Sequence, residues 1–311
     1  KYLKEFLSDK YVIRLPRLFW LALLHLVILR TRPKKSAELY RRVWTEWGSP
    51  LLYYTYSQTG LLNEKTKQDK NSLSFDAAMR YGNPSIRNKL YECVEAGYKD
   101  ITILPMFPQY STTTTLSIFE LIKTIIKKDR RSFENIRIHA INDFHNNSMY
   151  IQSCTKQIIR YQEKNGLPDK LLFSFHGIPE SYICEEEPYQ KQCIVTASLI
   201  AKSLGLEEKQ YEVAFQSRFG KAEWIKPYLS ERLSELPKEG IYNVQIFCPG
   251  FVSDCLETID EIGRESKEEY MEHGGKKFGF IPCLNNNNDF IDAIYEIQKN
   301  TDVSLIDWIL P

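Results

Sequence analysis

The sequence predicts an α/β protein with two halves, each built on a parallel sheet flanked by helices. Its 311 residues are enough for two domains, since a domain usually takes roughly 100–200 residues. Short apolar runs rich in β-branched and aromatic residues recur along the chain, and segments with helical periodicity separate most of them. Strands that alternate with helices are typical of parallel sheets covered by helices.

The predicted strands are short apolar runs bounded by turn residues: 73–81, 101–108, 136–142, 170–176, 212–216, 243–247 and 278–282. Three of them precede residue 145 and four follow it. We therefore expect a first domain of residues 1–145 and a second of residues 146–287. A C-terminal helix, residues 288–311, is expected to complete the first domain.

The predicted helices show apolar residues at steps of three and four. This pattern covers residues 86–94, 116–126 and 193–200, and Gly205 is the expected C-terminal cap of the third helix. The asparagine run 285–288 is expected to form a turn and the N-cap of a helix at 290–297.

The composition indicates an ordinary folded protein from a reducing compartment. Hydrophobic residues make up 43% and charged residues 26% of the chain, which excludes disordered, collagen-like and coiled-coil proteins. The seven cysteines are scattered and form no Cys-x-x-Cys pair, which argues against a disulfide framework and a zinc site. No nucleotide-binding glycine motif is present. We expect a cytoplasmic protein that binds no nucleic acid.

The first 42 residues form a basic arm around an apolar centre. They hold 11 Lys/Arg against 3 Asp/Glu, whereas the whole chain has a net charge of +1. The apolar run 18–29 is interrupted only by His25, and it is too short to span a bilayer, which needs about 20 residues. Flanking arginines are typical of segments that lie on a membrane surface, although a buried core helix would also contain such a run.

Residues that follow the strands are the candidates for chemistry, because ligands of such folds bind beyond the carboxyl ends of the strands. His176 ends an apolar strand, where it could be a base, a metal ligand or a structural histidine. Ser111 and the threonines 112–115 open a helix, so we expect one of them to be its N-cap.

Carboxylates at steps of three and four follow the loop 248–251 and share one face of a predicted helix: Asp254, Glu257, Glu261, Glu265, Glu268 and Glu272. Such a row could handle cations or protons. A solvated amphipathic helix would show the same pattern.

Together, these strand-end segments resemble the ferrochelatase family, closest to its proteobacterial type, whose members insert ferrous iron into porphyrin in haem synthesis. The matching segments are 105–111, 174–179, 216–220 with Trp224, and 248–258. They occur in family order over essentially the whole chain. The resemblance implies the chelatase fold, two Rossmann-like α/β halves with a cleft between them. Family members begin with a strand that precedes residue 1 of this chain, so we expect the first strand to be missing.

The resemblance also implies roles for individual residues. His176 matches the family's active-site histidine and Glu257 its partner, both as catalytic groups and as metal ligands, and which of the two takes the proton stays open. Glu261 and Glu265 would continue an acidic path along the helix. Porphyrin contacts are expected from Phe107, Tyr110, Ser111, Arg30 and Trp224, with Arg14 and Arg17 as further candidates near the propionates.

Ferrous iron and protoporphyrin IX are the substrates that the resemblance implies, with coproporphyrin left open. No iron–sulfur cluster is expected, because Thr112 stands where many members have a cysteine and no cysteine follows Cys283. The run 18–29 corresponds to the apolar lip of the cleft and predicts peripheral contact with an anionic membrane, at the inner membrane. The alternatives are a cobalt or nickel chelatase for another tetrapyrrole, and a tetrapyrrole carrier without turnover. The oligomeric state stays open.

Overall fold

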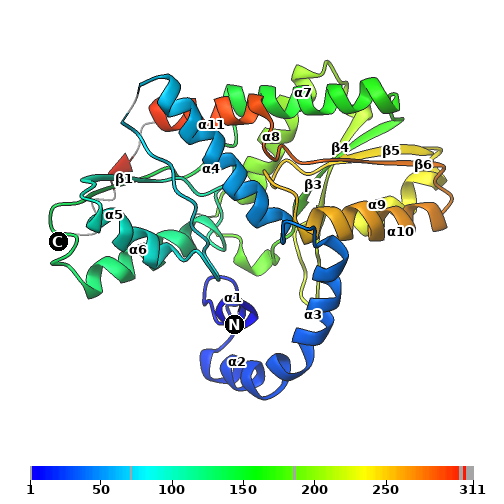
Figure 1. Ribbon diagram of the computed structural model, residues 1–311. Coiled ribbons are helices and arrows are strands. Elements are labelled where there is room, and N and C mark those ends of the chain that lie inside the picture. Colours follow the sequence, from blue (N-terminus) through cyan, green and yellow to red (C-terminus); the bar gives the residue numbers. More distant parts are fainter. Residues whose placement is uncertain (1, 71, 185–186, 301–303, 306–311) are drawn as a thin grey trace.

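A computed structural model describes residues 2–70, 72–184, 187–300 and 304–305 and has an α/β architecture with two sheets (Figure 1). The larger sheet is parallel, in the order β4-β3-β5-β6. Its strands are β3 (Lys170–His176), β4 (Tyr211–Gln216), β5 (Asn243–Phe247) and β6 (Lys277–Ile281). These bounds confirm the four strands predicted for the second half of the chain.

The smaller sheet has the order β1-β2-β7. β1 (Asp100–Ile103) and β2 (Arg137–Ala140) are parallel, and β7 (Ser304–Leu305) runs antiparallel to β2. The strand predicted at 73–81 is wrong. The backbone N–H and C=O of Phe75 bond to the side chain of Asn63, both at 2.8 Å, instead of to a neighbouring strand.

Helices cover both sheets (Figure 1). They are α1 (Tyr2–Leu7), α2 (Arg17–Leu23), α3 (Leu29–Val43), α4 (Pro50–Gln68), α5 (Ile86–Glu95), α6 (Thr115–Lys128), α7 (Ser148–Asn165), α8 (Tyr189–Ser203), α9 (Leu229–Glu235), α10 (Lys267–Glu272) and α11 (Asn288–Asn300). Two π-helices, η1 (Leu24–Ile28) and η5 (Glu257–Ser266), and three short 3₁₀ turns, η2 (Glu180–Tyr182), η3 (Glu208–Gln210) and η4 (Leu236–Glu239), complete the described helices. The helices predicted from periodicity are confirmed, and Gly205 follows α8 with a φ of +69°.

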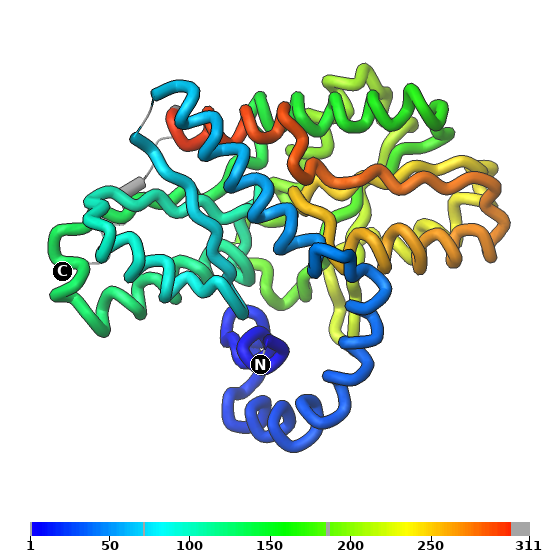
Figure 2. The backbone as a smooth tube through the Cα atoms, viewed as in Figure 1, coloured from blue at the N-terminus to red at the C-terminus, as the bar shows by residue number. Residues whose placement is uncertain are grey.

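α11 joins parts of the chain that lie far apart in sequence. It packs against α7 and α4, and Figure 2 shows these three segments side by side. Leu62 of α4 and Phe290 and Ile294 of α11 belong to one buried cluster, and Lys65 Nζ lies 2.7 Å from Asp292 Oδ1. The described helix ends at Asn300, and Ser304 and Leu305 form β7 on the edge of β2, so a single helix over 288–311 is wrong. Residues 301–303 and 306–311 lie outside the described residues. The boundary between the two expected domains at residue 145 stays a prediction.

The apolar lip, residues 18–29, lies in α2, η1 and the first residue of α3, on an excursion that projects from the body (Figures 1 and 2). Trp20 and Leu24 are buried, and Trp20 Nε1 donates to the carbonyl of Leu7 at 2.7 Å. Leu18 is 89% and Phe19 64% exposed. The run is thus not a core helix, because half of it faces outward. Within the part of the chain that the structure describes, no helix is both long and apolar enough to cross a bilayer.

Candidate functional site

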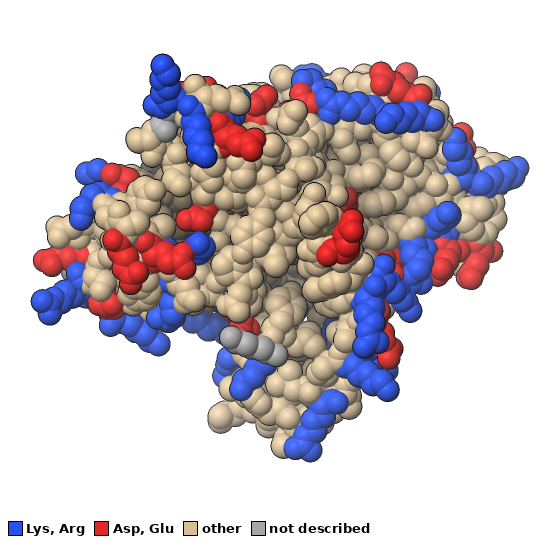
Figure 3. Space-filling model, in the orientation of Figure 1, with Lys and Arg blue, Asp and Glu red and all other residues tan. Residues whose placement is uncertain are grey.

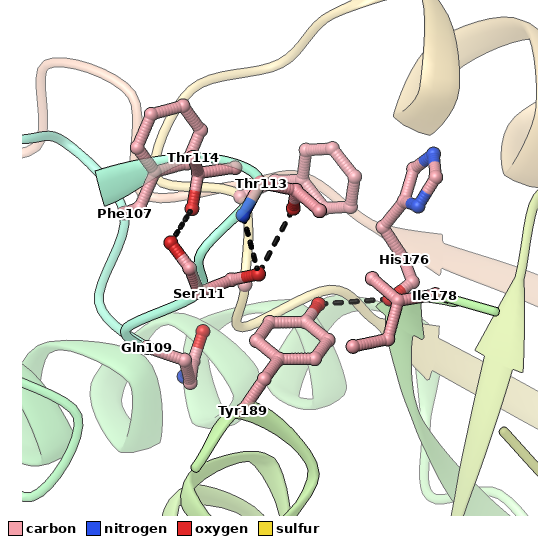
Figure 4. Close-up of a pocket in the computed structure, with 10 residues that line it drawn as sticks. Phe107, Gln109, Ser111, Thr113, Thr114, His176, Ile178 and Tyr189 are labelled. Atoms are coloured by element: carbon pink, nitrogen blue, oxygen red, sulfur yellow. Dashed lines mark hydrogen bonds between the residues drawn. The ribbon is translucent and has the colours of Figure 1, made fainter. Parts of the chain in front are cut away.

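A cavity of about 130 Å³ lies at the carboxyl end of β3 (Figure 4). His176 and Tyr189 line it from the second half of the chain, and Phe107, Gln109 and Ser111 line it from the first. Segments that are far apart in sequence therefore meet at one place, beyond the strand ends, as the fold class predicts.

His176 is the last residue of β3 and lies opposite Gln216 of β4. Its Nδ1 is 2.6 Å from the carbonyl oxygen of Gly177. A carbonyl only accepts hydrogen bonds, so Nδ1 carries a proton, and in the neutral imidazole Nε2 is then the acceptor. A Cβ on Gly177 would lie 3.0 Å from the Gln216 carbonyl and 3.1 Å from the Trp224 ring. Glycine after the histidine therefore lets the imidazole lie close to Trp224, at 6.3 Å between ring centroids.

Glu257 and Glu261 lie one π-helical turn apart on η5. Gln216 Nε2 donates to the Glu257 carbonyl at 2.9 Å, and Ser217 Oγ donates to Glu261 Oε2 at 2.7 Å. Burial raises the pKa of Glu261. The Ser217 hydrogen bond and the charge of His176 oppose this shift, and the charge of Glu257 adds to it. The structure thus brings Glu261 into the electrostatic neighbourhood of both His176 and Glu257.

The carboxylate row predicted on one α-helix divides into three parts. Asp254 precedes the helix and is buried, and the row then continues on the π-helix η5 and on α10. Glu265 and Glu268 are exposed and both pair with Arg264, at 2.7 and 3.0 Å. The expectation of a single α-helical face is therefore wrong, and the place of Glu265 in an acidic path stays a prediction.

The expected porphyrin-contacting residues lie in different surroundings. Phe107 and Ser111 line the cavity, and Trp224 packs against His176. Tyr110 is not among the residues that line this cavity, and its backbone N–H donates to Gln192 Oε1 at 2.6 Å. Arg30 is exposed on α3. Their contacts with porphyrin stay predictions.

Of the two further arginine candidates, Arg14 ties the base of the lip excursion to the body, and Arg17 bonds within the N-terminal segment itself. Arg14 donates to Thr112 Oγ1 and lies over the Tyr182 ring at 4.3 Å. Arg17 donates to the Ser8 carbonyl.

At the hydroxyl-rich start of α6, one of the expected residues takes the N-cap position but makes no capping bond. The N-cap residue is Thr114, and its side chain makes no capping bond. Ser111 Oγ accepts from the backbone N–H of Thr113 at 3.1 Å, and buried Glu187 accepts from Ser111 Oγ at 3.2 Å and from Thr112 N at 2.8 Å. The hydroxyl groups of this segment thus form part of the cavity wall and do not cap the N-terminus of α6.

Some residues of the site were not predicted. Ser217 directly follows β4, so the rule that points to strand ends could have found it. Tyr189 donates to the His176 carbonyl at 2.8 Å, but it begins a helix far from any strand end in sequence. No cluster of three or more His, Cys, Asp or Glu side chains arranged to hold a metal occurs among the described residues.

Comparison with known proteins matches residues 1–301 to the family model Ferrochelatase. The ferrochelatase of Idiomarina loihiensis is 43% identical over 300 residues, which cover 96% of this chain and 82% of the relative. The ferrochelatase of Marinobacter nauticus is 43% identical over 312 residues, which cover 100% and 83%. Among solved structures, SirB from Bacillus subtilis with Fe³⁺ has the same fold, with a TM-score of 0.57 at 16% identity, and the match covers 82% of this chain and 92% of that one. The chain belongs to the ferrochelatase family.

Proposed function

We propose that this chain, a lyase of haem synthesis by its family, inserts ferrous iron into protoporphyrin IX at the site around His176. The reaction replaces two pyrrole protons of the porphyrin with one Fe²⁺ ion. The observation that carries the proposal is the place of Glu261: Ser217 holds it beyond the end of β4, where it interacts electrostatically with both His176, at the end of β3, and Glu257. An acceptor nitrogen and carboxylates can take up the protons that such an exchange releases.

In this proposal, His176 Nε2 takes the pyrrole protons. The Nδ1 proton is held by the Gly177 carbonyl, so Nε2 keeps its lone pair, and a neutral imidazole is a suitable base near pH 7. Glu261 receives the proton from His176, because its raised pKa makes it a better acceptor near neutral pH than an exposed carboxylate. Glu257 guides the incoming iron, since carboxylates and imidazoles are common ligands of Fe(II).

Turnover with different metals and porphyrins tests this function. The purified protein is offered Fe(II), Co(II) or Zn(II) with protoporphyrin IX or coproporphyrin, and the product is read from its absorption spectrum. We expect protohaem from Fe(II) and protoporphyrin IX. A product formed only with cobalt or with coproporphyrin would assign a different chelatase, and tight porphyrin binding without metallation over hours would favour a carrier.

We also expect the purified protein to contain no iron–sulfur cluster. Thiolates are the ligands of [2Fe–2S] clusters. Thr112 has no sulfur, and it stands where the family resemblance places one of the cluster cysteines. The measurements are visible absorption and an assay for acid-labile sulfide on anaerobically purified protein. Cluster absorption together with stoichiometric sulfide would contradict the expectation.

We further propose that the lip binds the surface of anionic membranes. Leu18, Phe19 and Leu26 of the lip are exposed. The lip itself carries no Lys or Arg, but Figure 3 shows such side chains next to it and along α3. Exposed apolar side chains can enter the headgroup region, and each basic side chain near an anionic surface adds about 1 kcal/mol, which salt weakens.

Flotation with vesicles tests membrane binding. We expect the protein to float with vesicles rich in anionic lipid and to be released as the salt concentration rises. Leu18→Glu should weaken flotation, whereas Leu167→Glu, which changes another exposed leucine that is 76% accessible after α7, should not. Equal flotation of the two variants, or flotation that does not change with salt, would contradict membrane binding through the lip.

A further inference from the structure

Asn285, in the turn between β6 and α11, bonds through every polar group it has. Its backbone N–H donates to the Val252 carbonyl at 2.8 Å, and its own carbonyl accepts from Gln58 Nε2 at 2.7 Å. Its side-chain oxygen accepts from the backbone N–H of Asp254 at 2.8 Å, and its side-chain nitrogen donates to Asp254 Oδ2 at 2.7 Å. Its φ is +52°, a conformation that asparagine tolerates better than most residues.

Asp254 connects Asn285 to the start of η5 through hydrogen bonds. Its side chain is buried, and its second oxygen, Oδ1, accepts from Thr258 Oγ1 at 3.0 Å and from Cys283 N at 3.2 Å. Thr258 Oγ1 in turn accepts from the backbone N–H of Cys255 at 3.0 Å. Thr258 directly follows Glu257, so this network fixes the first turn of the π-helix. Gln216 holds the Glu257 carbonyl from β4.

The same network reaches the first half of the chain. Gln58 is a buried residue of α4, and its side-chain nitrogen donates to Ser253 Oγ at 3.0 Å as well as to the Asn285 carbonyl. Buried polar groups are stabilising only when they are paired, and a displacement of about 1 Å at a reacting group can cost about 100-fold in rate. By holding the backbone at the start of η5, this network can fix the position of the Glu257 carboxylate.

We propose that Asn285 and Asp254 are positioning residues for metal insertion, which hold the start of η5 and thereby the carboxylate of Glu257. This inference rests on the proposed function of Glu257. Neither residue lines the cavity next to His176, so both act through the helix and not on the porphyrin.

An exchange of the two side chains tests the proposal. In Asn285→Asp, two carboxylates would face each other where Asp254 Oδ2 now accepts a hydrogen bond. In Asp254→Asn, the new amide cannot accept from Asn285, Thr258 and Cys283 at once. In the double variant Asp254→Asn/Asn285→Asp, the asparagine accepts from Thr258 and Cys283 and donates to the new aspartate. Every bond and the net charge are then retained.

We expect each single variant to lower kcat for iron insertion by about 10- to 100-fold, with the KM for porphyrin changed less than about twofold. The double variant should recover kcat to within a few-fold of the parent protein. Single variants that keep kcat, a loss that falls on KM, or a double variant that is no better than the single ones would each overturn the proposal.

Thr258→Val provides a milder probe if the single variants do not fold. It removes only the hydroxyl that joins Asp254 to Cys255. Its matched control is Thr155→Val, which removes a buried threonine hydroxyl in α7 that donates to the Ile151 carbonyl at 2.9 Å. At similar melting temperatures, only Thr258→Val should lower kcat, and equal rates would overturn the proposal. The parent protein is assayed first: no metallation there refutes the proposed function itself, whereas metallation unaffected by these variants refutes only the positioning role.

Discussion

Replacing His176 by alanine is expected to lower kcat for iron insertion by about 100-fold or more, since a positioned general base contributes about 10²–10⁴-fold. Porphyrin should still bind, because His176 contributes one side chain to a cavity that Phe107, Gln109 and Tyr189 also line. Haem formation followed by absorption gives kcat, and quenching of porphyrin fluorescence gives the affinity.

His273→Ala is the matched control for this variant. His273 is exposed after α10, and its Nδ1 lies 2.8 Å from the Glu269 carbonyl, so it also has one ring nitrogen on a backbone carbonyl. Its loss should leave kcat unchanged. Normal turnover in His176→Ala would show that the central residue of the proposed mechanism is wrong, and loss of porphyrin binding there would make it a binding residue.

Glu257→Gln is expected to lower kcat to a similar extent, by about 10²-fold or more. The substitution keeps the size of the side chain but removes the charge that can attract iron and affect Glu261. The carbonyl that accepts from Gln216 remains in place, so the local backbone is retained. Turnover at saturating porphyrin and a titration of kcat against Fe(II) concentration measure the effect.

Glu268→Gln should leave the rate unchanged, because Glu268 is exposed in α10 and pairs with Arg264 at 3.0 Å. An exposed ion pair contributes about 0–1 kcal/mol to stability, so this control also folds. If both substitutions lowered kcat equally, the carboxylates would have only a structural role, in stabilising the helix. If neither did, Glu257 would have no part in the reaction.

The sequence predicts the larger sheet well because its strands carry a local signal. Residues 171–175 of β3 are all buried, so the strand is a continuous apolar run between turn residues. Residues 73–81 also hold apolar and aromatic residues, although Asp76 and Arg80 interrupt them. There, Asn63 from α4 binds the backbone groups of Phe75. A contact between a helix side chain and an extended segment leaves no periodic pattern in the sequence.

The site is predictable where chemistry follows a strand directly, as with His176. The site is not predictable from the sequence where its chemistry depends on tertiary contacts. The hydrogen bonds of Glu187 to Ser111 and Thr112 join residues about 75 positions apart, and no sequence motif predicts them. The π-helix was also missed, because carboxylates spaced by four residues suit an α-helix equally well.

The packing of α11 on α4 has a consequence for biosynthesis. The bond between Lys65 and Asp292 spans 227 residues, and Leu62 lies in the same buried cluster as Phe290. Synthesis proceeds from the N-terminus at about 5–20 residues per second, so α4 leaves the ribosome about 10–45 s before its partner helix is made. During that interval Leu62 and Lys65 of α4 lack their native contacts with α11. We expect the nascent chain to depend on chaperones until residues near 297 have emerged.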